Sequence, residues 1–215
     1  MTRCLLLCNG EPPSRQLCRE LARKANLIVA ADGGANAARC YGITPDIIIG
    51  DLDSISPATR RFFSSATIEQ VSRQDSTDLE KALDYLVNRK VGSVIIAGAT
   101  GRRIDFTLAN LSVLWNYALH FQLTVVNDGW MAIPVGRALK VSARKGTTVS
   151  IIPFGPCTGI TLKGLQYPLH NARMRIGQIG VSNVVVRSPF SVQVRKGRML
   201  LIIFDVKARP VRHAS

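Results

Sequence analysis

The chain has 215 residues, of which 28 are basic and 14 acidic, so its formal net charge is +14. With 47% hydrophobic and 20% charged residues it can bury a core, which excludes a broadly disordered protein. Its apolar runs, such as residues 200–204, fall far short of the ~20 residues that span a bilayer, and the run at residues 4–8 is too short for a secretory signal. We therefore expect a cytoplasmic protein with no membrane-spanning helix.

Short apolar runs alternate with helical patterns over the first 128 residues. Such runs suit strands that are buried on both faces of a parallel sheet. The clearest helix is the last, because Ile104, Leu108, Leu111, Trp115 and Ala118 fall on one helical stripe. The order of elements predicts a doubly wound, mostly parallel α/β/α domain. The expected strands are residues 4–8, 27–31, 47–49, 67–71, 94–97 and 123–126, and the expected helices are residues 15–24, 35–41, 57–64, 78–89 and 104–119.

The pattern changes after residue 128, and no helical periodicity follows. Short β-rich pieces are separated by glycine and proline, which is typical of an antiparallel sandwich or barrel. We predict an α/β domain over residues 1–132 and an antiparallel β-sandwich over residues 133–215. The expected strands of the second domain are residues 141–143, 147–153, 159–162, 183–187, 192–195 and 199–206.

Acidic residues are distributed unevenly between the two halves of the chain. Residues 1–128 hold 14 basic and 13 acidic side chains, whereas residues 129–215 hold 14 basic side chains and one acid, Asp205. A basic excess of this size attracts phosphate backbones, so nucleic-acid binding is one hypothesis for the second half. The few aromatic residues there fall mostly inside strand patterns, where they would pack in the core rather than stack on bases. We therefore favour basic faces that are simply in solvent.

The five cysteines and three histidines argue against two further kinds of site. The cysteines are odd in number and have no CxxC spacing, so a disulfide framework is not expected. With so few histidines, a zinc site of the His/Cys type is not expected either. We expect buried or incidental thiols.

Most acidic residues outside the helix faces lie in turns next to the expected strands. The carboxyl edge of an open α/β sheet is where its ligands bind. Four acidic turns at one edge would repel one another unless a cation or a cationic substrate joined them. We therefore expect a cation-dependent site formed by the turns at residues 31–36, 50–54, 75–78 and 98–105.

Among the acidic residues of these turns, Asp51 and Asp53 most clearly suggest a metal site. If the strand direction persists through them, both carboxylates lie on one side, about 6.6 Å apart at Cα. Oxygen ligands of this kind suit Mg²⁺, which takes a few carboxylates together with phosphate oxygens and water. The alternative is a solvated turn in which Asp53 or Ser54 caps the short helix near residue 57.

Two other segments have both a structural and a chemical interpretation. Thr77 and Glu80 form a T-x-x-E capping box, which leaves Asp75 unexplained, and Lys81 either lies in solvent or reaches a phosphate. The turn at residues 98–103 offers amides and two arginines to a phosphate, or is a glycine turn with solvated arginines. It has neither the Walker A spacing nor the G-x-G-x-x-G spacing.

Taken in order, these segments resemble the thiamine pyrophosphokinase family. The resemblance implies an α/β nucleotide domain followed by a β-sandwich. It implies transfer of the pyrophosphoryl group of ATP to the hydroxyl of thiamine, with Mg²⁺ and with release of AMP. It also implies a homodimer that holds thiamine between the α/β domain of one subunit and the sandwich of the other. The matching segments are ADGGAN at 31–36, GDLDS at 50–54, DSTDLEKAL at 75–83, GATGRRIDFTLAN at 98–110, GLQYPL at 164–169 and GVSN at 180–183.

The resemblance also implies roles for individual residues. The metal and catalytic carboxylates look like Asp51, Asp53 and Asp78, with Asp78 or Asp105 as the base that accepts the proton of the substrate hydroxyl. The residues on the ATP side look like Asp32, Gly33, Gly34, Asn36, Thr77, Lys81 and Arg103. The residues on the thiamine side look like Ser182 and Asn183, with Gln74, Asp75 and Asp105 as further candidates.

Two positions depart from the family pattern. Arg102 stands where the family often has a second glycine, and Phe106 stands where it often has a histidine. Phe106 cannot shuttle a proton, but Arg103 and Asp105 are retained. A pyrophosphokinase for another hydroxymethyl heterocycle, such as a pterin, would show similar acidic turns and would differ around Ser182, so it remains an alternative.

Overall fold

Two units make up the chain, Met1–Asp128 and Gly129–Ser215. The computed structural model describes residues 2–73, 75–178, 180–205 and 209–210. The division lies four residues before the predicted boundary at 132/133. The reason is strand β7 (Trp130–Val135), which the sequence pattern did not predict. It pairs antiparallel with β14 (Met199–Ile203) and so belongs to the second unit.

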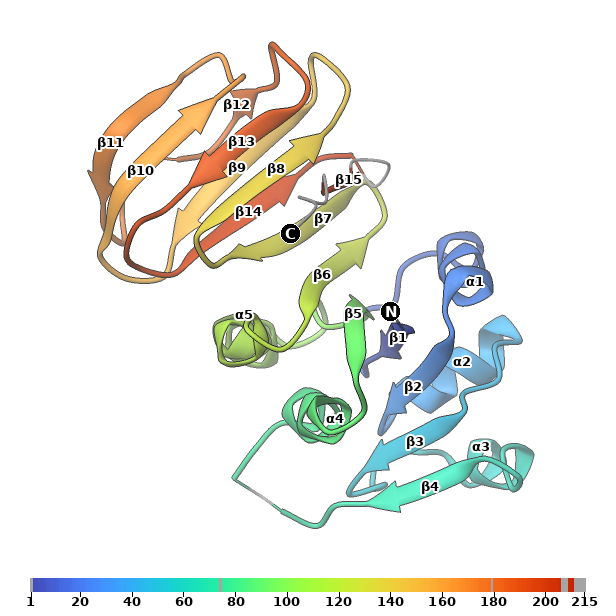
Figure 1. Cartoon of the computed structure of the whole chain (residues 1–215). Coiled ribbons are helices and arrows are strands. Elements are labelled where there is room, and N and C mark those ends of the chain that lie inside the picture. The colour runs from blue at the N-terminus through green and yellow to red at the C-terminus, as the bar shows by residue number, and fades with distance from the viewer. Residues whose placement is uncertain (1, 74, 179, 206–208, 211–215) are drawn as a thin grey trace. The chain divides into compact units, whose positions relative to one another are not determined.

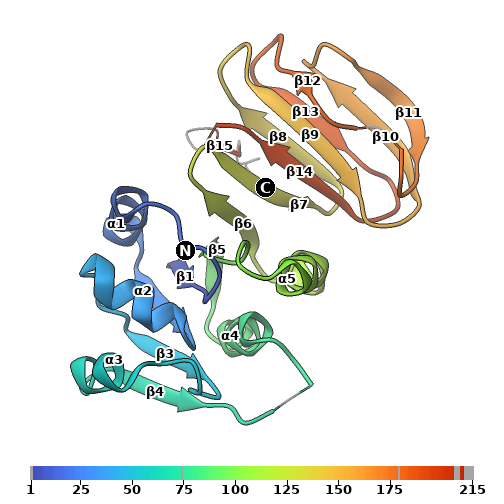
Figure 2. The ribbon, with the colours of Figure 1, turned by 180° about the vertical axis from the view of Figure 1, so that it is seen from behind.

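A parallel sheet in the order β6-β5-β1-β2-β3-β4 forms the centre of the first unit. Helices α1 to α3 cover one face of this sheet and helices α4 and α5 cover the other (Figures 1 and 2). This arrangement confirms the predicted doubly wound domain. The strands are β1 (Thr2–Leu7), β2 (Leu27–Ala31), β3 (Ile47–Gly50), β4 (Thr67–Gln70), β5 (Val91–Ala97) and β6 (Gln122–Asn127), and the helices are α1 (Arg15–Lys24), α2 (Gly34–Tyr41), α3 (Pro57–Phe62), α4 (Asp78–Val87) and α5 (Ile104–Tyr117).

Side-chain caps set the starts of three of these helices. Thr77 and Glu80 form the predicted capping box of α4, and Ser14 caps α1 by accepting a hydrogen bond from the Leu17 amide. Ser56 caps α3 by accepting from the Thr59 amide, so neither Asp53 nor Ser54 has that role. Both residues are thereby left available to the pocket described below.

The buried face of α5 differs from the stripe that periodicity indicated. Its buried residues are Asn110, Leu114 and Tyr117, whereas Ile104 and Leu108 are 73% and 57% exposed. Because α5 has apolar side chains on more than one face, the sequence pattern alone did not determine which face is buried.

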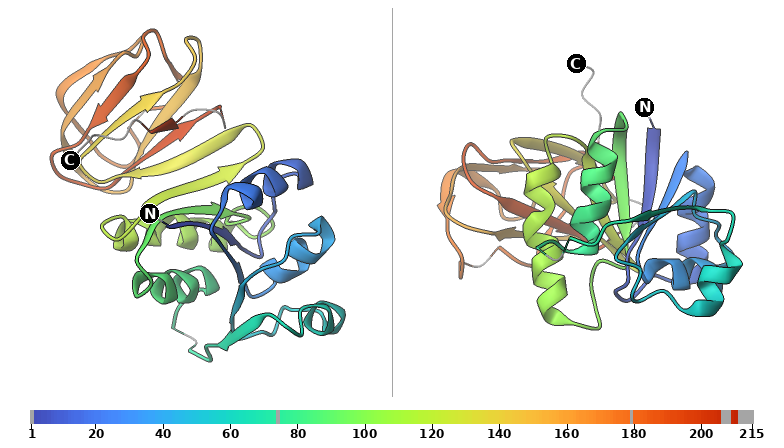
Figure 3. Two further views of the ribbon diagram at one scale, coloured as in Figure 1. Left: turned by 45° about the vertical axis from the view of Figure 1, so that its right-hand side comes forward. Right: turned by 90° about the horizontal axis from the view of Figure 1, so that it is seen from below.

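Two antiparallel sheets pack face to face in the second unit, which confirms the predicted β-sandwich (Figure 3, left). One sheet has the order β12-β9-β14-β7 and contributes Ile151 and Leu201 to the core; the other has the order β11-β10-β13-β8-β15 and contributes Ile160 and Phe190. The remaining strands are β8 (Ala138–Ser142), β9 (Thr148–Pro153), β10 (Cys157–Lys163), β11 (Leu169–Met174), β12 (Asn183–Val184), β13 (Phe190–Gln193) and β15 (Arg209–Pro210).

The cysteines are all free thiols; Cys40 is exposed and the other four are buried. Within the described ranges, none of the helices is both long enough and apolar enough to cross a bilayer.

Candidate active site

A pocket of about 850 Å³ lies at the carboxyl ends of the parallel strands of the first unit. Cys8 and Asn9 follow β1, Asp51 follows β3, and Ala99 follows β5 in its lining. β1 lies between β2 and β5, so the order of the strands changes direction there. A reversal of this kind is where open α/β sheets bind their ligands. The acidic turns therefore meet where the sequence predicted.

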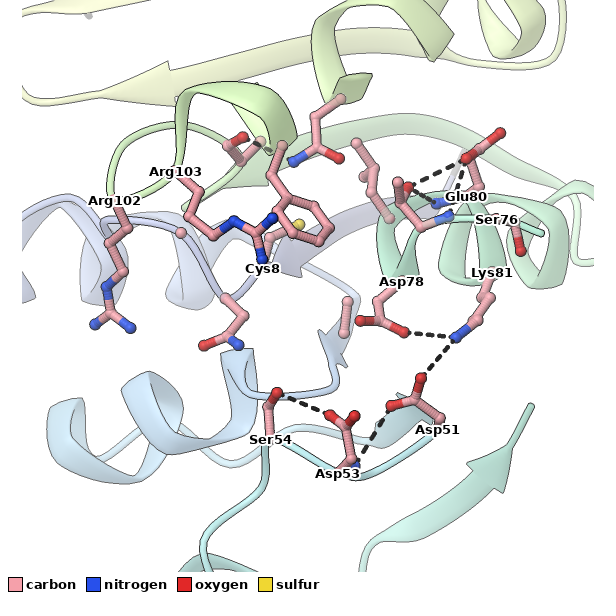
Figure 4. A pocket seen from close by; sticks show the side chains of 18 of the residues that line it. Cys8, Asp51, Asp53, Ser54, Ser76, Asp78, Glu80, Lys81, Arg102 and Arg103 are labelled. Carbon is pink, nitrogen blue, oxygen red and sulfur yellow. Dashed lines mark hydrogen bonds and ion pairs between the residues drawn. The ribbon is translucent and has the colours of Figure 1, made fainter. Parts of the chain in front are cut away.

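Three carboxylates come together in this region. One ligand oxygen each of Asp32, Asp51 and Asp78 lies within 4.8 Å of the others. Asp32 follows β2 and is 1% exposed, Asp51 follows β3, and Asp78 is the first residue of α4. Figure 4 shows Asp51 and Asp78 on facing sides of the pocket with Lys81 between them.

Gly50 makes this approach sterically feasible. A Cβ at this position would lie 2.9 Å from Cβ of Asp32 and 3.1 Å from Oδ1 of Asp78. Any side chain here would press on two of the three carboxylates. Its φ of +151° is also one that residues with a side chain rarely adopt.

Lys81 lies against the cluster as its counter-charge. Its Nζ is 2.9 Å from Oδ1 of Asp78 and 3.2 Å from Oδ2 of Asp51, and its side chain is only 2% exposed. Burial lowers the pKa of this ammonium, but the hydrogen bonds and charges of Asp78 and Asp51 outweigh burial and raise its pKa above the ordinary value. Lys81 is therefore a charged member of the site, held in one position.

The carboxylates themselves are in unequal environments. Burial, with smaller contributions from Asp78 and Asp53, raises the pKa of Asp32 in spite of hydrogen bonds from Gly33 and Ser54. Burial also acts to raise the pKa of Asp51, but the hydrogen bond from Lys81 and other favourable contacts leave it below its ordinary value. With all three ionised, the carboxylates and Lys81 carry a net charge of −2, which matches a divalent cation.

Asp53 lies in the pocket but outside this cluster of three. The expected extended geometry through Asp51 and Asp53 is wrong, because β3 ends at Gly50 and Leu52 takes a left-handed φ of +70°. The Asp53 amide donates to Oδ1 of Asp51 (3.4 Å), and the Ser54 hydroxyl donates to Oδ1 of Asp53 (2.9 Å). The tight turn thus brings Asp32, rather than Asp53, against Asp51 and Asp78.

The turn between β5 and α5 carries two arginines in different environments. Nε of Arg103 donates to Oδ1 of Asp105 (3.1 Å), and its guanidinium lies 4.5 Å from the centre of the Phe106 ring. This pairing raises the pKa of Arg103 and lowers that of Asp105. Arg102, in contrast, has a left-handed φ of +55°, which costs an L residue roughly 1–2 kcal/mol. Both arginines line the pocket, whereas Asp105 does not line it.

Other residues predicted for the ATP side hold the loops together. Nδ2 of Asn36 donates to the carbonyl of Ser54 (2.8 Å), and its Oδ1 accepts from the Ser56 amide (3.0 Å), so it ties α2 to the 51–56 loop. Gly33 and Gly34 form the start of α2, and a Cβ on Gly34 would collide with the carbonyl of Leu7. These three residues shape the site through its backbone.

The segment before α4 lies at the mouth of the pocket. Thr77 and Asp75 line it, and Oδ1 of Asp75 is 3.0 Å from Nε of Arg73. Arg73 also pairs with Asp84 of α4 at 2.7 Å, which fastens the segment to that helix. The predicted residue Gln74 lies outside the described residues.

Ser182 and Asn183 belong to the second unit and have different structural roles. The Asn183 side chain is buried, donates to the carbonyl of Tyr167 (2.8 Å) and accepts from the amides of Tyr167 (3.0 Å) and Val184 (2.8 Å). Ser182 is exposed, in a left-handed conformation with φ of +60°. Of the two, Ser182 has its hydroxyl available to a ligand.

Sequence reasoning missed Asn9, Gly10 and Asn110 in the pocket lining. Nδ2 of Asn110 donates to the carbonyl of Ala99 (2.8 Å), while its buried Oδ1 has no hydrogen-bond partner in the part of the chain that the structure describes. Asn9 and Gly10 directly follow a strand, as the acidic turns do, so the same position-based argument would have found them. Neither residue is charged, so a search for acidic turns passes over both.

Two family models match this chain, one in each of its two units. Residues 18–126 match the family model described as "Thiamin pyrophosphokinase, catalytic domain", and residues 138–199 match "Thiamin pyrophosphokinase, vitamin B1 binding domain". The chain belongs to the thiamine pyrophosphokinase family. The catalytic match lies inside the unit that holds the pocket, and the vitamin-binding match lies inside the sandwich.

Relatives within the thiamine pyrophosphokinase family match over most of their length. Thiamine pyrophosphokinase 1 of Arabidopsis thaliana is 30% identical, with 79% of this chain and 74% of the relative covered. Thiamine pyrophosphokinase of Bacillus subtilis is 28% identical, with 82% of this chain and 86% of the relative covered.

Solved structures of thiamine pyrophosphokinases have the same two-part fold. The Bacillus subtilis structure superposes with a TM-score of 0.82 at 23% identity, covering 95% of this chain and 99% of that one. The Candida albicans structure has a TM-score of 0.83 at 19% identity, covering 95% and 89%. At these identities, the likeness supports the fold.

Proposed function

We propose that this protein is a thiamine pyrophosphokinase that transfers the pyrophosphoryl group of ATP to the hydroxyl of thiamine, giving thiamine diphosphate and AMP. The observation that carries the proposal is the cluster of Asp32, Asp51 and Asp78 with Lys81, in a pocket of the unit that matches the catalytic family model. The match of the sandwich to a vitamin B1 binding domain supports thiamine as the acceptor.

The donor set of the pocket fits Mg²⁺. Three carboxylate oxygens converge within 4.8 Å, and the net charge of the cluster with Lys81 equals that of the ion with opposite sign. Asp51 and Asp78, two of the three metal carboxylates that the resemblance implies, would hold the ion together with Asp32, and the third, Asp53, lines the same pocket. When bound, Mg²⁺ neutralises phosphate oxygens and so lowers their repulsion of an incoming nucleophile.

The chain's own side chains would position the phosphates and move the proton. Attack at phosphorus depends mainly on alignment and charge neutralisation. Lys81 and Arg103 supply cationic groups at two walls of the pocket. Both Asp78 and Asp105 are paired with a basic residue, but Asp78 lines the pocket and Asp105 does not. This contrast supports Asp78 as the group that accepts the proton of the substrate hydroxyl.

The acceptor is a cation, and the pocket suits one. The thiazolium of thiamine has a fixed positive charge, which exposed carboxylates such as Asp75 would attract. The exposed Ser182 hydroxyl is the group of the sandwich that we propose for thiamine. We further propose that the enzyme works in the cytoplasm as a homodimer with thiamine at the subunit interface. The basis for that assembly is what the resemblance to the family implies.

One assay tests the activity. Purified protein is incubated with ATP, MgCl₂ and thiamine, and the products are separated by chromatography. Thiamine diphosphate and AMP in equal amounts are expected, and the Asp51→Asn variant serves as the control for contaminating activity. Formation of ADP, or turnover with a pterin alcohol but none with thiamine, would overturn the proposal. Sedimentation velocity tests the homodimer separately.

A further inference from the structure

Arg102 and Arg103 are neighbours in the turn between β5 and α5 but differ in their contacts. The Arg103 guanidinium is bound by Asp105 and stacks on Phe106. The Arg102 guanidinium has no hydrogen bond, ion pair or ring contact with any residue that the structure describes, although Arg102 lines the pocket. Its charge is therefore fully available to a ligand.

The other basic groups of the pocket lining are already paired. Lys81 contacts two carboxylates and Arg103 contacts one. Figure 4 shows the guanidinium of Arg102 well apart from the carboxylates of Asp51, Asp53 and Asp78. An anionic ligand that enters this pocket would thus meet one unneutralised cation, and that cation is Arg102.

The backbone of Arg102 shows that the arginine is retained at a cost. Its φ of +55° lies in the left-handed region, where glycine is favoured and a long side chain is strained. Strained residues cluster at ligand-binding sites, and Arg102, unlike the equally strained Lys90, lines the pocket. Among the described residues, no hydrogen bond, ion pair or ring contact of the guanidinium offsets the strain, and the residue is exposed.

We propose that Arg102 is a further phosphate-binding residue of this site, whose guanidinium binds the phosphate chain of a nucleoside triphosphate. The proposal deepens the proposed function and rests on it for the identity of the ligand. A guanidinium presents several donors in a rigid fork and binds phosphate oxygens two at a time. Arg102 thereby supplies an unpaired positive charge, whereas the charge of Arg103 is already paired with Asp105.

The test replaces Arg102 by glycine and measures nucleotide affinity directly. Loss of a charge-assisted contact in Arg102→Gly should weaken the Kd for MgATP, measured calorimetrically without thiamine, by about tenfold. The KM for ATP should rise to a similar extent, while the KM for thiamine stays unchanged. The Tm should stay the same or rise, because glycine relieves the left-handed strain.

Lys90 provides a matched control. It is basic and exposed, has a left-handed φ of +48°, and lies in the turn between α4 and β5, away from the pocket lining. Lys90→Gly removes one positive charge and the same kind of strain, so its Tm should respond as that of Arg102→Gly does. Its affinity for MgATP should equal that of the wild type. Arg102→Lys, which keeps the charge without the fork, should fall between the wild type and Arg102→Gly.

The possible outcomes distinguish the role of Arg102 from the proposed function. Unchanged MgATP affinity in Arg102→Gly, or an equal loss in Lys90→Gly, would overturn the role of Arg102 while thiamine diphosphate formation continued to support the function. Wild-type protein that binds MgATP through Arg102 but forms no thiamine diphosphate would overturn the function and leave the phosphate site standing. Wild-type protein that does not bind MgATP would overturn both.

Discussion

The two units differ in how their charges are arranged rather than in how many basic residues they hold. Each contains 14 Lys and Arg residues, but the first also holds 13 acids and the second only Asp205. In the first unit, opposite charges meet inside a pocket at distances near 3 Å. In the second, the one acid, Asp205, is 7% exposed and pairs with Arg144 at 3.1 Å, so most basic residues of this unit have no acidic residue of the same unit to pair with.

The clustering of several carboxylates with a lysine in one pocket, and not net charge, therefore marks the proposed reactive region. Charges a few ångströms apart in a partly buried site interact strongly, whereas exposed charges of one sign are screened by salt. The electrically balanced unit therefore contains the chemistry, although the summed charge of the chain directs attention to the basic one.

The largest expected effect is in the first unit. Asp51→Asn should lower turnover by about 100-fold or more, because it removes a carboxylate from the proposed ion site and leaves Lys81 with one partner. The rate of AMP release at saturating substrates measures it. Circular dichroism should show that the variant is folded.

A control on the same sheet separates this role from charge alone. Glu69 lies on β4 and outside the pocket lining, so Glu69→Gln changes the net charge equally and should keep near-normal turnover. If Asp51→Asn retained more than half of the wild-type rate at saturating Mg²⁺, the pocket would not be the ion site. The contrast between the units would then fail.

The second prediction separates two adjacent residues of the sandwich. Asn183→Ala removes three hydrogen bonds of a buried amide, so the free energy of unfolding should fall by about 2–3 kcal/mol and the Tm by about 4–12 °C. Ser182→Ala should leave the Tm nearly unchanged and raise the KM for thiamine about 3–10-fold. Thermal melts and thiamine titrations measure the two effects. The opposite pattern would make Asn183 the thiamine contact.

The third prediction concerns the buried carboxylate of the first unit. Because burial raises the pKa of Asp32, the ionised form destabilises the fold, and this cost grows as the pH rises through the interval between its ordinary and its raised pKa. Asp32→Asn should therefore raise the Tm of the metal-free protein at pH 7 and weaken stabilisation by added Mg²⁺. Melts in EDTA and in MgCl₂ measure both. A lower Tm in EDTA would contradict this account of Asp32.

Elements with local signals were predictable from the sequence. Helix α1 has the predicted bounds and α4 begins at the predicted capping box, because each cap depends on residues three positions apart. The pocket was also predictable, since Asp32 and Asp51 directly follow apolar runs and Asp78 begins a helix with a capping box. β7 and β11 were not: β7 contains Pro134, which disfavours a strand, and β11 is a mostly exposed edge strand without an apolar run.

Features that depend on backbone turns or on distant packing were not predictable. The replacement of Asp53 by Asp32 in the carboxylate cluster follows from the left-handed Leu52 and from the space at Gly50, neither of which residue spacing reveals. The pocket position of Asn110 depends on which side of α5 is buried. Single-sequence periodicity leaves that choice open when several faces of a helix are apolar.

The smallest expected effect is in the basic unit. Lys163 of β10 and Lys140 of β8 both pair with Ser191 of β13, so they lie in one row on the same face of the sheet. Replacing both by glutamate lowers the net charge by four. If these lysines act only by weak long-range attraction of ATP, kcat/KM for ATP in the double variant should change less than about threefold at physiological salt. At low salt the change should be somewhat larger.

Binding of duplex DNA, measured by fluorescence anisotropy, is a second test of whether the basic residues of the second unit act only through bulk electrostatics. Bulk electrostatics predicts weak binding at low salt that is lost at physiological salt and reduced further in the double variant. Tight, salt-resistant binding would make the row of Lys140 and Lys163 a nucleic-acid site. A tenfold fall in kcat/KM for ATP in the double variant at physiological salt would make these lysines part of the ATP site. Either result would mean that the second unit, too, contributes its charge at close range.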